Sequence, residues 1–285
     1  MDKKKRLKKS SDRRRKQIAF AEQRLMKKTA AQQRKLNRFI RGLYLETLDI
    51  KDGRVTASKL NRTKVGQSKE LRNYIRGIMD RELLGFYRDE FEKIESRSKT
   101  YYNKLGADET THASVMDVAI DKKEVFLQDL FDTNTFEKAI RQTITNAINT
   151  NQTKANLEKT LTEQIKGTDK KLGMVEGYHY REGKAEFSAY SRTIQNGYKT
   201  NLNLNYAIYQ GGEITTTRSF CDARNGKVFN LEEILAMNNL DWQGKKDNHN
   251  ILIDCGGYNC RHDWDWISFE LAQELRPSIK KSKYD

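Results

Sequence analysis

The chain has 285 residues, of which 36% are hydrophobic and 33% charged, and its formal net charge is +15. This length allows one large domain or two small ones, and the low apolar content is more typical of long solvated helices than of an enzyme with a thick core. No stretch of about 18 apolar residues occurs, and no apolar segment follows the basic N-terminus, so we expect neither a membrane span nor a secretory signal. Three cysteines are too few for a disulfide scaffold and indicate a reducing compartment.

The positive charge is concentrated in residues 1–42, which contain 17 of the 54 Lys and Arg but only 3 of the 39 Asp and Glu. The remainder of the chain is therefore nearly neutral and carries one basic arm. The first sixteen residues are too charged to collapse on their own. Apolar residues from Ile18 to Leu48 then recur at helical spacing, which predicts a long basic helix over about 13–48.

A basic arm on a neutral body is typical of a nucleic-acid anchor. We expect binding to double-stranded DNA without sequence preference, because no base-reading fold accompanies the arm. The alternatives are a solvated charged helix and an RNA or acidic-protein partner. The candidate DNA-binding residues are Lys3, Lys4, Lys5, Arg6, Lys8, Lys9, Arg13, Arg14, Arg15 and Lys16.

Residues 43–210 are predicted to form a helical body. A turn-rich connector over 51–68 precedes a helix that Ser68 can cap and that continues to about Tyr102. Further helices are predicted over 113–131, 132–148, 151–167 and 184–209, with Gly167 ending the third of these.

Residues 211–285 are predicted to form a small α+β module. The segment "EITTTRSF" favours a strand, "NGKVF" a turn into a short strand, and "NLEEILAM" a short helix capped by Asn230. The segment "HNILIDCGGYNC" is interpreted as a strand, a glycine turn and a strand. The predicted fold class is therefore mainly α with a small C-terminal α+β module, with long helices and few short strands.

Four residues of this module are candidate metal ligands, namely Cys221, Cys255, Cys260 and His262. Three thiolates and one imidazole are ligands that tetrahedral zinc accepts, and the two glycines after Cys255 allow a turn that brings it near Cys260. The spacing lacks the C-x2-C of a strong zinc signature, so buried structural thiols are the favoured alternative and a redox or nucleophilic cysteine the lesser one.

The segment around His249 is faintly like an HNH nuclease, but it lacks the neighbouring acid–histidine pair of that chemistry. No Ser-His-Asp, P-loop or G-x-G-x-x-G pattern occurs either. We therefore predict a structural protein that is not an enzyme. A metal-dependent nuclease and a free nucleic-acid-binding regulator remain the alternative functions.

Two segments together, "TTTRSFCDARNGKVFNLEEI" and "CGGYNCRHDW", resemble the C-terminal signature of the Mu F-like phage head morphogenesis proteins, also called phage minor head proteins. The resemblance covers about residues 185–270. The matching residues are Arg218, Ser219, Cys221, Arg224, Gly226, Lys227, Val228 and Phe229, followed by Gly256, Gly257, Asn259, Cys260, Arg261 and His262.

The resemblance implies a minor component of the virion head that is assembled in the bacterial cytoplasm. It implies association with the portal vertex or inner capsid, with contacts to the portal protein, the major capsid protein and packaged DNA, and self-association in a ring at the vertex. The signature residues are then architectural. The glycines would supply turns, and the arginines would hydrogen-bond carbonyls or carboxylates. These structural residues are Arg218, Gly226, Lys227, Gly256, Gly257, Asn259 and Arg261.

Overall fold

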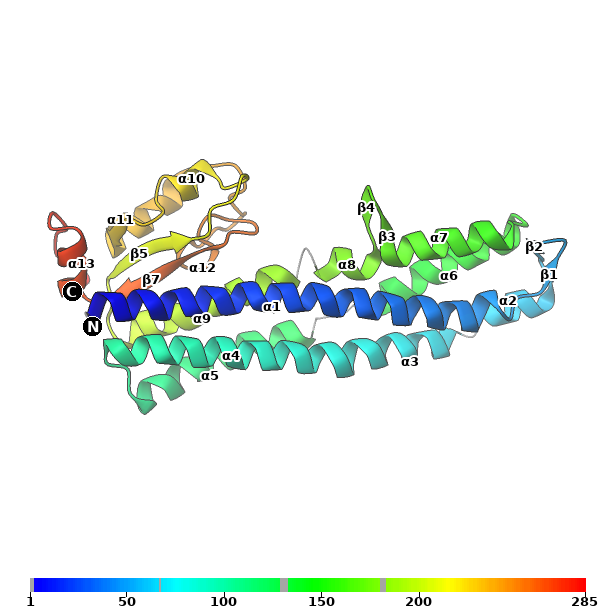
Figure 1. Cartoon of the computed structure of the whole chain (residues 1–285), viewed down its shortest axis with the longest axis horizontal. Coiled ribbons are helices and arrows are strands. Elements are labelled where there is room, and N and C mark those ends of the chain that lie inside the picture. The colour runs from blue at the N-terminus through cyan, green and yellow to red at the C-terminus, as the bar shows by residue number, and fades with distance from the viewer. Residues whose placement is uncertain (1–2, 67, 129–132, 180–182) are drawn as a thin grey trace. The chain divides into compact units, whose positions relative to one another are not determined.

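The computed structural model describes residues 3–66, 68–128, 133–179 and 183–285. The described chain is mainly helical and has few short strands in small sheets, which confirms the predicted fold class (Figure 1). It forms two compact units, each built from segments distant in the sequence, whereas the sequence pattern suggested three consecutive regions, 1–42, 43–210 and 211–285. Unit 1 comprises Met1–Glu22, Asp89–Phe126 and Ala185–Asp285, and unit 2 comprises Gln23–Arg88 and Leu127–Lys184.

The N-terminal helix α1 (Lys3–Ile40) begins about ten residues earlier than the periodicity predicted. Its first turns have a buried stripe at helical spacing, formed by Leu7, Ser11, Arg14 and Ile18. This stripe packs within unit 1, so the segment that seemed too charged to collapse is held as helix by tertiary contacts. A short π-helix, η1 (Arg41–Leu45), follows α1.

Unit 2 is a set of helices with two small hairpins. The predicted helix after Ser68 is present, but a π-helical turn at Met79–Leu83 interrupts it before it continues into α4 (Leu84–Tyr102). Gly167 ends α7 (Lys154–Lys166) at a positive φ of 86°, as predicted for a C-cap glycine. Its elements after η1 are β1 (Ile50–Lys51), β2 (Arg54–Val55), α2 (Lys59–Gly66), α3 (Ser68–Ile78), η2 (Met79–Leu83), α6 (Thr133–Asn149), α7 (Lys154–Lys166), β3 (Gly167–Thr168), β4 (Lys171–Leu172) and α8 (Met174–Tyr178).

Unit 1 combines helices with a three-stranded antiparallel sheet of order β6-β5-β7. The helix predicted over 113–131 is α5, and residues 129–131 lie outside the described residues. The elements are α4 (Leu84–Tyr102, from Asp89 on), η3 (Asn103–Leu105), α5 (Glu109–Gln128), α9 (Lys184–Asn201), β5 (Tyr206–Gly211), α10 (Ser219–Asp222), β6 (Val228–Asn230), α11 (Leu231–Ala236), η5 (Met237–Asn239), α12 (Ile251–Asp254), β7 (His262–Ile267) and α13 (Phe269–Leu275).

Two local predictions in the C-terminal module are confirmed. Strand β6 follows the Gly226 turn, and α11 begins at Asn230 with a complete capping box. The Asn230 side chain accepts from the Glu233 backbone, and the Glu233 carboxylate accepts from the Asn230 backbone. Both features depend on residues that are close in sequence, so they can be predicted without knowledge of the tertiary fold.

Three other predictions were wrong. The helix predicted over 184–209 ends at Asn201, and Tyr206–Gly211 forms β5, the central strand of the sheet. In "EITTTRSF", the Ile214 backbone donates to the Thr217 hydroxyl at 2.7 Å, and the segment is a turn followed by α10 instead of a strand. Residues 251–254 form the helical turn α12 instead of a strand, because the Asn250 side chain caps it.

Candidate functional site

Strand β7 organises the site through the alternation of its side chains. His262, Trp264 and Trp266 share one face, and Asp263 and Asp265 share the other. All are buried, because the strand is covered on both faces. The sequence "HDWDW" therefore supplies a histidine and aromatic rings to one side of the sheet and two carboxylates to the opposite side.

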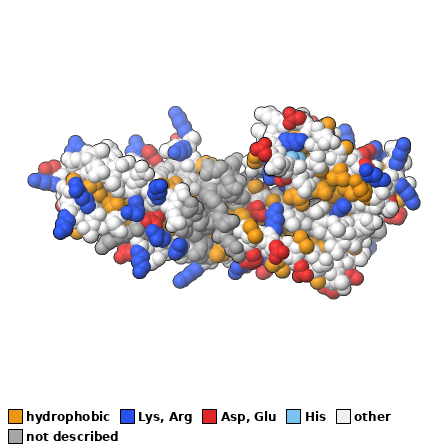
Figure 2. Space-filling view, turned by 180° about the vertical axis from the view of Figure 1, so that it is seen from behind, with side chains coloured by type: hydrophobic (Ala, Val, Ile, Leu, Met, Phe, Trp, Pro, Cys, Tyr) orange, Lys and Arg blue, Asp and Glu red, His pale blue; other side chains and the backbone are white. Residues whose placement is uncertain are grey.

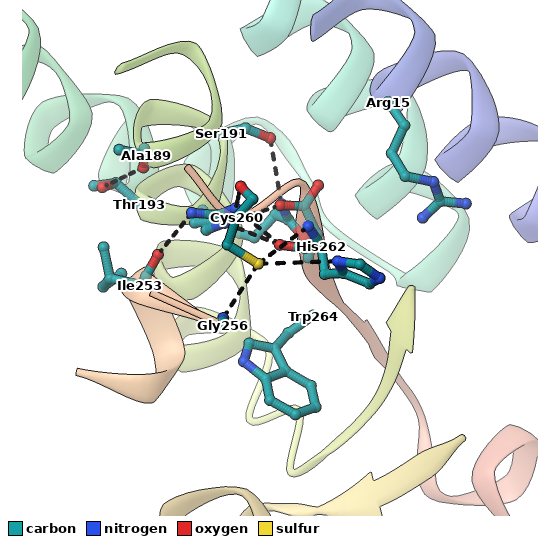
Figure 3. A network of polar contacts seen from close by, with 12 residues as sticks. Arg15, Ala189, Ser191, Thr193, Ile253, Gly256, Cys260, His262 and Trp264 are labelled. Atoms are coloured by element: carbon teal, nitrogen blue, oxygen red, sulfur yellow. Dashed lines mark hydrogen bonds and ion pairs between the residues drawn. The ribbon is translucent and has the colours of Figure 1, made fainter. Parts of the chain in front are cut away.

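On the aromatic side, Cys221, Cys260 and His262 form one compact group, of which Figure 3 shows Cys260 and His262. The two sulphur atoms are 3.8 Å apart, and the Cys260 sulphur is 3.9 Å from the Nδ1 atom of His262. All three side chains are buried, and the three candidate ligand atoms lie within 4.8 Å of one another. The structure thus brings together three of the four predicted ligands. Cys255 is also buried but is not a member of the group.

Tyr209 on β5 completes the surroundings of this group. Its hydroxyl lies 3.3 Å from the Cys221 sulphur and 3.7 Å from the Cys260 sulphur. Its ring stacks on the His262 ring, with centroids 5.1 Å apart and planes 7° from parallel. The sequence pattern missed Tyr209, because the segment was predicted to be helical and its strand pairing with Trp264 involves a residue 55 positions later.

Backbone donors surround the Cys260 sulphur. The Gly256 and His262 backbone N–H groups point at it from 3.2 and 3.4 Å (Figure 3). A hydrogen bond with the Cys221 thiol, contacts with His262 and the charge of Arg192 hold the pKa of Cys260 well below its ordinary value, although burial opposes this. The same hydrogen bond and burial raise the pKa of Cys221. The pair is therefore arranged to hold one thiolate, which hydrogen bonds from N–H groups stabilise.

Arg192 on α9 fastens the loop that carries Cys260. Its buried guanidinium donates to the backbone carbonyls of Cys260 at 2.5 Å and His262 at 2.9 Å, and to the Asp263 carboxylate at 3.1 Å. The sequence pattern also missed this residue. Arg192 lies on the helical face of Ser188 and Gln195, opposite the apolar face of Tyr190 and Ile194, so the apolar pattern of the helix did not indicate it.

The signature glycines make close approaches or turns. Gly226 and Gly257 have φ of 77° and 94°, a region that favours glycine. A Cβ on Gly256 would lie 2.2 Å from the Cys221 sulphur and 3.0 Å from that of Cys260. The module can therefore close over its thiols only with glycine at this position.

The other signature residues also make structural contacts. Arg218 donates to the Tyr258 carbonyl at 2.5 Å, and Arg261 lies 4.0 Å from the Glu22 carboxylate. Asn259 has φ of 54°, and Lys227 is exposed while its backbone carbonyl accepts from Tyr209. These contacts agree with the expected use of arginine to bond carbonyls and carboxylates.

On the opposite side of β7, the aspartates meet α1. Asp265 contacts Ser11 and Arg14 through short hydrogen bonds and Arg15 at 2.8 Å. Arg14 also lies 3.9 Å from Asp263, and no part of its side chain is exposed. This placement corrects the prediction for Arg14, since a buried arginine bound to two carboxylates cannot reach a DNA phosphate. Arg15 is half-buried and is likewise engaged, chiefly with Asp265.

Most of the remaining predicted DNA-binding residues lie on the solvent side of α1. They are Lys4, Lys5, Arg6, Lys8, Lys9, Arg13 and Lys16, all exposed, whereas the side chain of Lys3 lies outside the described residues. Lys4 is 3.8 Å from Glu274 in an exposed pair. The positions opposite the buried stripe, Lys5, Arg6, Lys9, Arg13 and Lys16, form a continuous row of cations that we call the basic stripe.

Lys104 extends the basic stripe from another part of the chain. Its amino group donates to the Arg6 carbonyl at 3.4 Å. Burial lowers the pKa of Lys104, and the nearby charges of Arg13 and Arg6 lower it further. Its contribution depends on packing between residues almost one hundred positions apart, so the sequence did not indicate it.

A groove of about 1270 Å³ lies between the start of α1 and the sheet of unit 1. Its lining includes the apolar residues Ile208, Phe229 and Leu271 and charged residues of both signs, among them Lys8 and Lys16 from α1 and Glu233 from α11. In the space-filling view, hydrophobic side chains also gather in a patch on unit 1, while Lys and Arg side chains project from both units (Figure 2). Unit 1 therefore offers both apolar and basic surface to a partner.

No family model, curated protein or solved structure matches this chain. Among the helices that the structure describes, none has both the length and the apolar character needed to cross a bilayer. The geometry of unit 1 is thus the basis for assigning a function.

Proposed function

We propose that this protein is a structural minor head protein of a tailed phage, which contacts packaged DNA through the basic stripe of α1. The basic stripe is the observation that carries the proposal. Five exposed cations occupy about three helical turns of α1, at positions opposite the buried stripe that meets the carboxylates of β7. Such a row matches the dense phosphate charge of duplex DNA and requires no base-reading element.

The signature residues of the C-terminal module support an architectural role. Arg218 binds a backbone carbonyl, as Arg192 of α9 also does outside the signature, and Gly256 provides the space that the buried sulphur atoms need. The resemblance to the Mu F-like signature adds the setting, since that family belongs to phage heads. The nuclease alternative is not favoured, because the compact Cys221–Cys260–His262 group includes neither a carboxylate nor His249.

The groove of unit 1 supports the expected protein contacts. A groove lined by apolar residues and by charged residues of both signs suits a segment of a head protein that presents apolar and charged side chains. The portal protein and the major capsid protein are the proposed partners, and a ring of copies at the vertex is the proposed assembly. The chain should therefore co-purify, at a few copies per particle, with heads of the phage that encodes it.

The DNA contact can be tested by salt-dependent binding to duplex DNA of arbitrary sequence. Replacing Lys5, Lys9, Arg13 and Lys16 by glutamine removes up to four phosphate contacts. The slope of log K against log salt should then become shallower by about 3 to 4, since each contact contributes about 0.9. The matched control replaces Lys138, Lys166, Lys170 and Lys171, four exposed lysines outside α1.

The two variants carry the same net charge, so non-specific effects of charge should affect both equally. If the control variant loses as much of the salt slope as the stripe variant, the basic stripe is not the DNA contact. If the unmodified protein shows a strong preference for one sequence, the regulator alternative replaces the head-protein proposal.

A further inference from the structure

The buried group Cys221, Cys260 and His262 has the dimensions of a metal centre. In a tetrahedral zinc site with Zn–S bonds of about 2.3 Å, two thiolates lie about 3.8 Å apart. The Cys221 and Cys260 sulphurs are 3.8 Å apart, which is too far for a disulfide bond and equals the separation expected for two zinc-bound thiolates. The His262 Nδ1 atom at 3.9 Å from Cys260 is near the separation of about 3.6 Å expected for a sulphur and a nitrogen ligand.

The position of Tyr209 fits the fourth corner of the same tetrahedron. An oxygen ligand at about 2.0 Å from zinc would lie about 3.5 Å from each thiolate. The Tyr209 hydroxyl is 3.3 and 3.7 Å from the two sulphurs, values that bracket this separation. Its ring lies parallel to the His262 imidazole. Tyr209 is on β5 and His262 is on β7, so both side chains reach the group from the same sheet.

The backbone next to the two sulphurs agrees with an ion at this place. Gly256 leaves no room for a Cβ beside the sulphurs, so its backbone closes directly over them. The N–H groups on Cys260 and the guanidinium of Arg192 are outer contacts of the kind that orient metal-bound thiolates.

We propose that this group binds one Zn²⁺ ion through Cys221, Cys260 and His262, with the Tyr209 hydroxyl at the fourth position, as a structural centre that closes the C-terminal module. Two thiolates neutralise the ion, and Arg192 is balanced by Asp263. Cys255 is excluded, which revises the ligand set expected from sequence. This inference does not depend on DNA binding, so either proposal can fail without the other.

The test uses the full-length protein purified under reducing conditions. Metal analysis should find about one zinc per chain. Replacement by Co²⁺ should give the visible bands of tetrahedral cobalt and a sulphur-to-cobalt charge-transfer band. Cys221→Ser and Cys260→Ser should weaken binding by more than the roughly 10–100-fold that loss of an outer contact costs. Cys255→Ser is the matched control, since it removes a buried thiol outside the group, and it should keep one metal per chain.

The fourth position is tested by Tyr209→Phe, which keeps the ring and removes the hydroxyl. It should retain the charge-transfer band but shift the visible cobalt bands and weaken the affinity, whereas unchanged spectra would remove Tyr209 from the ligand set. Circular dichroism of each variant verifies that it is folded. The zinc proposal is overturned if folded unmodified protein binds no more metal than the Cys221→Ser/Cys260→Ser double variant. The proposal is also overturned if Cys255→Ser loses as much bound metal as the Cys221→Ser/Cys260→Ser double variant. A disulfide between Cys221 and Cys260 in place of the ion would overturn it too.

Discussion

Arg14 links the N-terminal helix to the C-terminal strand, and its replacement by methionine should destabilise the protein strongly. Arg14 and Asp265 are almost fully buried and are joined by a short hydrogen bond, while Asp263 lies 3.9 Å from the same guanidinium. Burial lowers the pKa of Arg14, but the two carboxylates outweigh this and raise it. The charged form of Arg14 is therefore an integral part of unit 1.

The loss of unfolding free energy in Arg14→Met depends on the partners that remain to the buried carboxylates. Breaking a buried ion pair costs about 3–5 kcal/mol, because one charge stays buried without its partner. Here Asp265 keeps a contact with Arg15 at 2.8 Å and with Ser11, and Asp263 keeps Arg192 at 3.1 Å. We therefore expect the lower end of that range, about 3 kcal/mol. Methionine is apolar and similar in length, so loss of packing should add little.

Urea unfolding followed by tryptophan fluorescence is a suitable assay, since Trp264 and Trp266 flank Asp265 on β7. The matched control is Arg13→Met, which removes an exposed charge one residue earlier and should change stability by less than about 0.5 kcal/mol. In the double variant Arg14→Met/Asp265→Leu, the loss should be smaller than the sum of the single losses. If Arg14→Met and Arg13→Met unfold at the same urea concentration, the buried pair does not hold α1 in place.

Three further predictions concern stability. Gly256→Ala should cost about 1–3 kcal/mol in urea unfolding, because its Cβ would lie 2.2 Å from the Cys221 sulphur, and an unchanged midpoint would contradict this crowding. Asn230→Ala should cost about 1 kcal/mol through loss of the capping box with Glu233, whereas Asn230→Asp should be nearly neutral; equal losses would rule out the cap. Burial raises the pKa of Asp265, but Arg14 and its other partners hold it below the ordinary 3.8. The contribution of ionised Asp265 to the free energy of unfolding is thus present above about pH 4 and is lost as pH falls through the lower folded pKa. Asp265→Asn should therefore lose less stability than the unmodified protein when the pH is lowered over this range.

Features that depend on neighbouring residues were predictable from the sequence. The Asn230 capping box, the Gly226 turn and the C-cap at Gly167 each involve a few adjacent positions, whose conformational preferences act locally. The concentration of charge in residues 1–42 is likewise a property of the chain itself. The helical fold class follows from apolar residues at helical spacing.

Tertiary structure decided which of the predicted site residues act together. Cys255 and Cys260 are five positions apart, yet the group pairs Cys260 with Cys221, 39 positions away, because α10 packs against the loop before β7. Tyr209 enters the group only because Tyr206–Gly211 becomes the central strand. A segment of six residues carries too weak a local preference to choose between helix and strand, so pairing with β6 and β7 made that choice.

The basic arm shows the same division most clearly. The sequence determined that ten cations lie within residues 3–16 of the chain, and with it the strong positive potential of this end. Only the fold decided that Arg14 faces inward, because the two aspartates that neutralise it are about 250 residues away on β7. Charge is a property of the residue, but exposure depends on which distant segment packs against it.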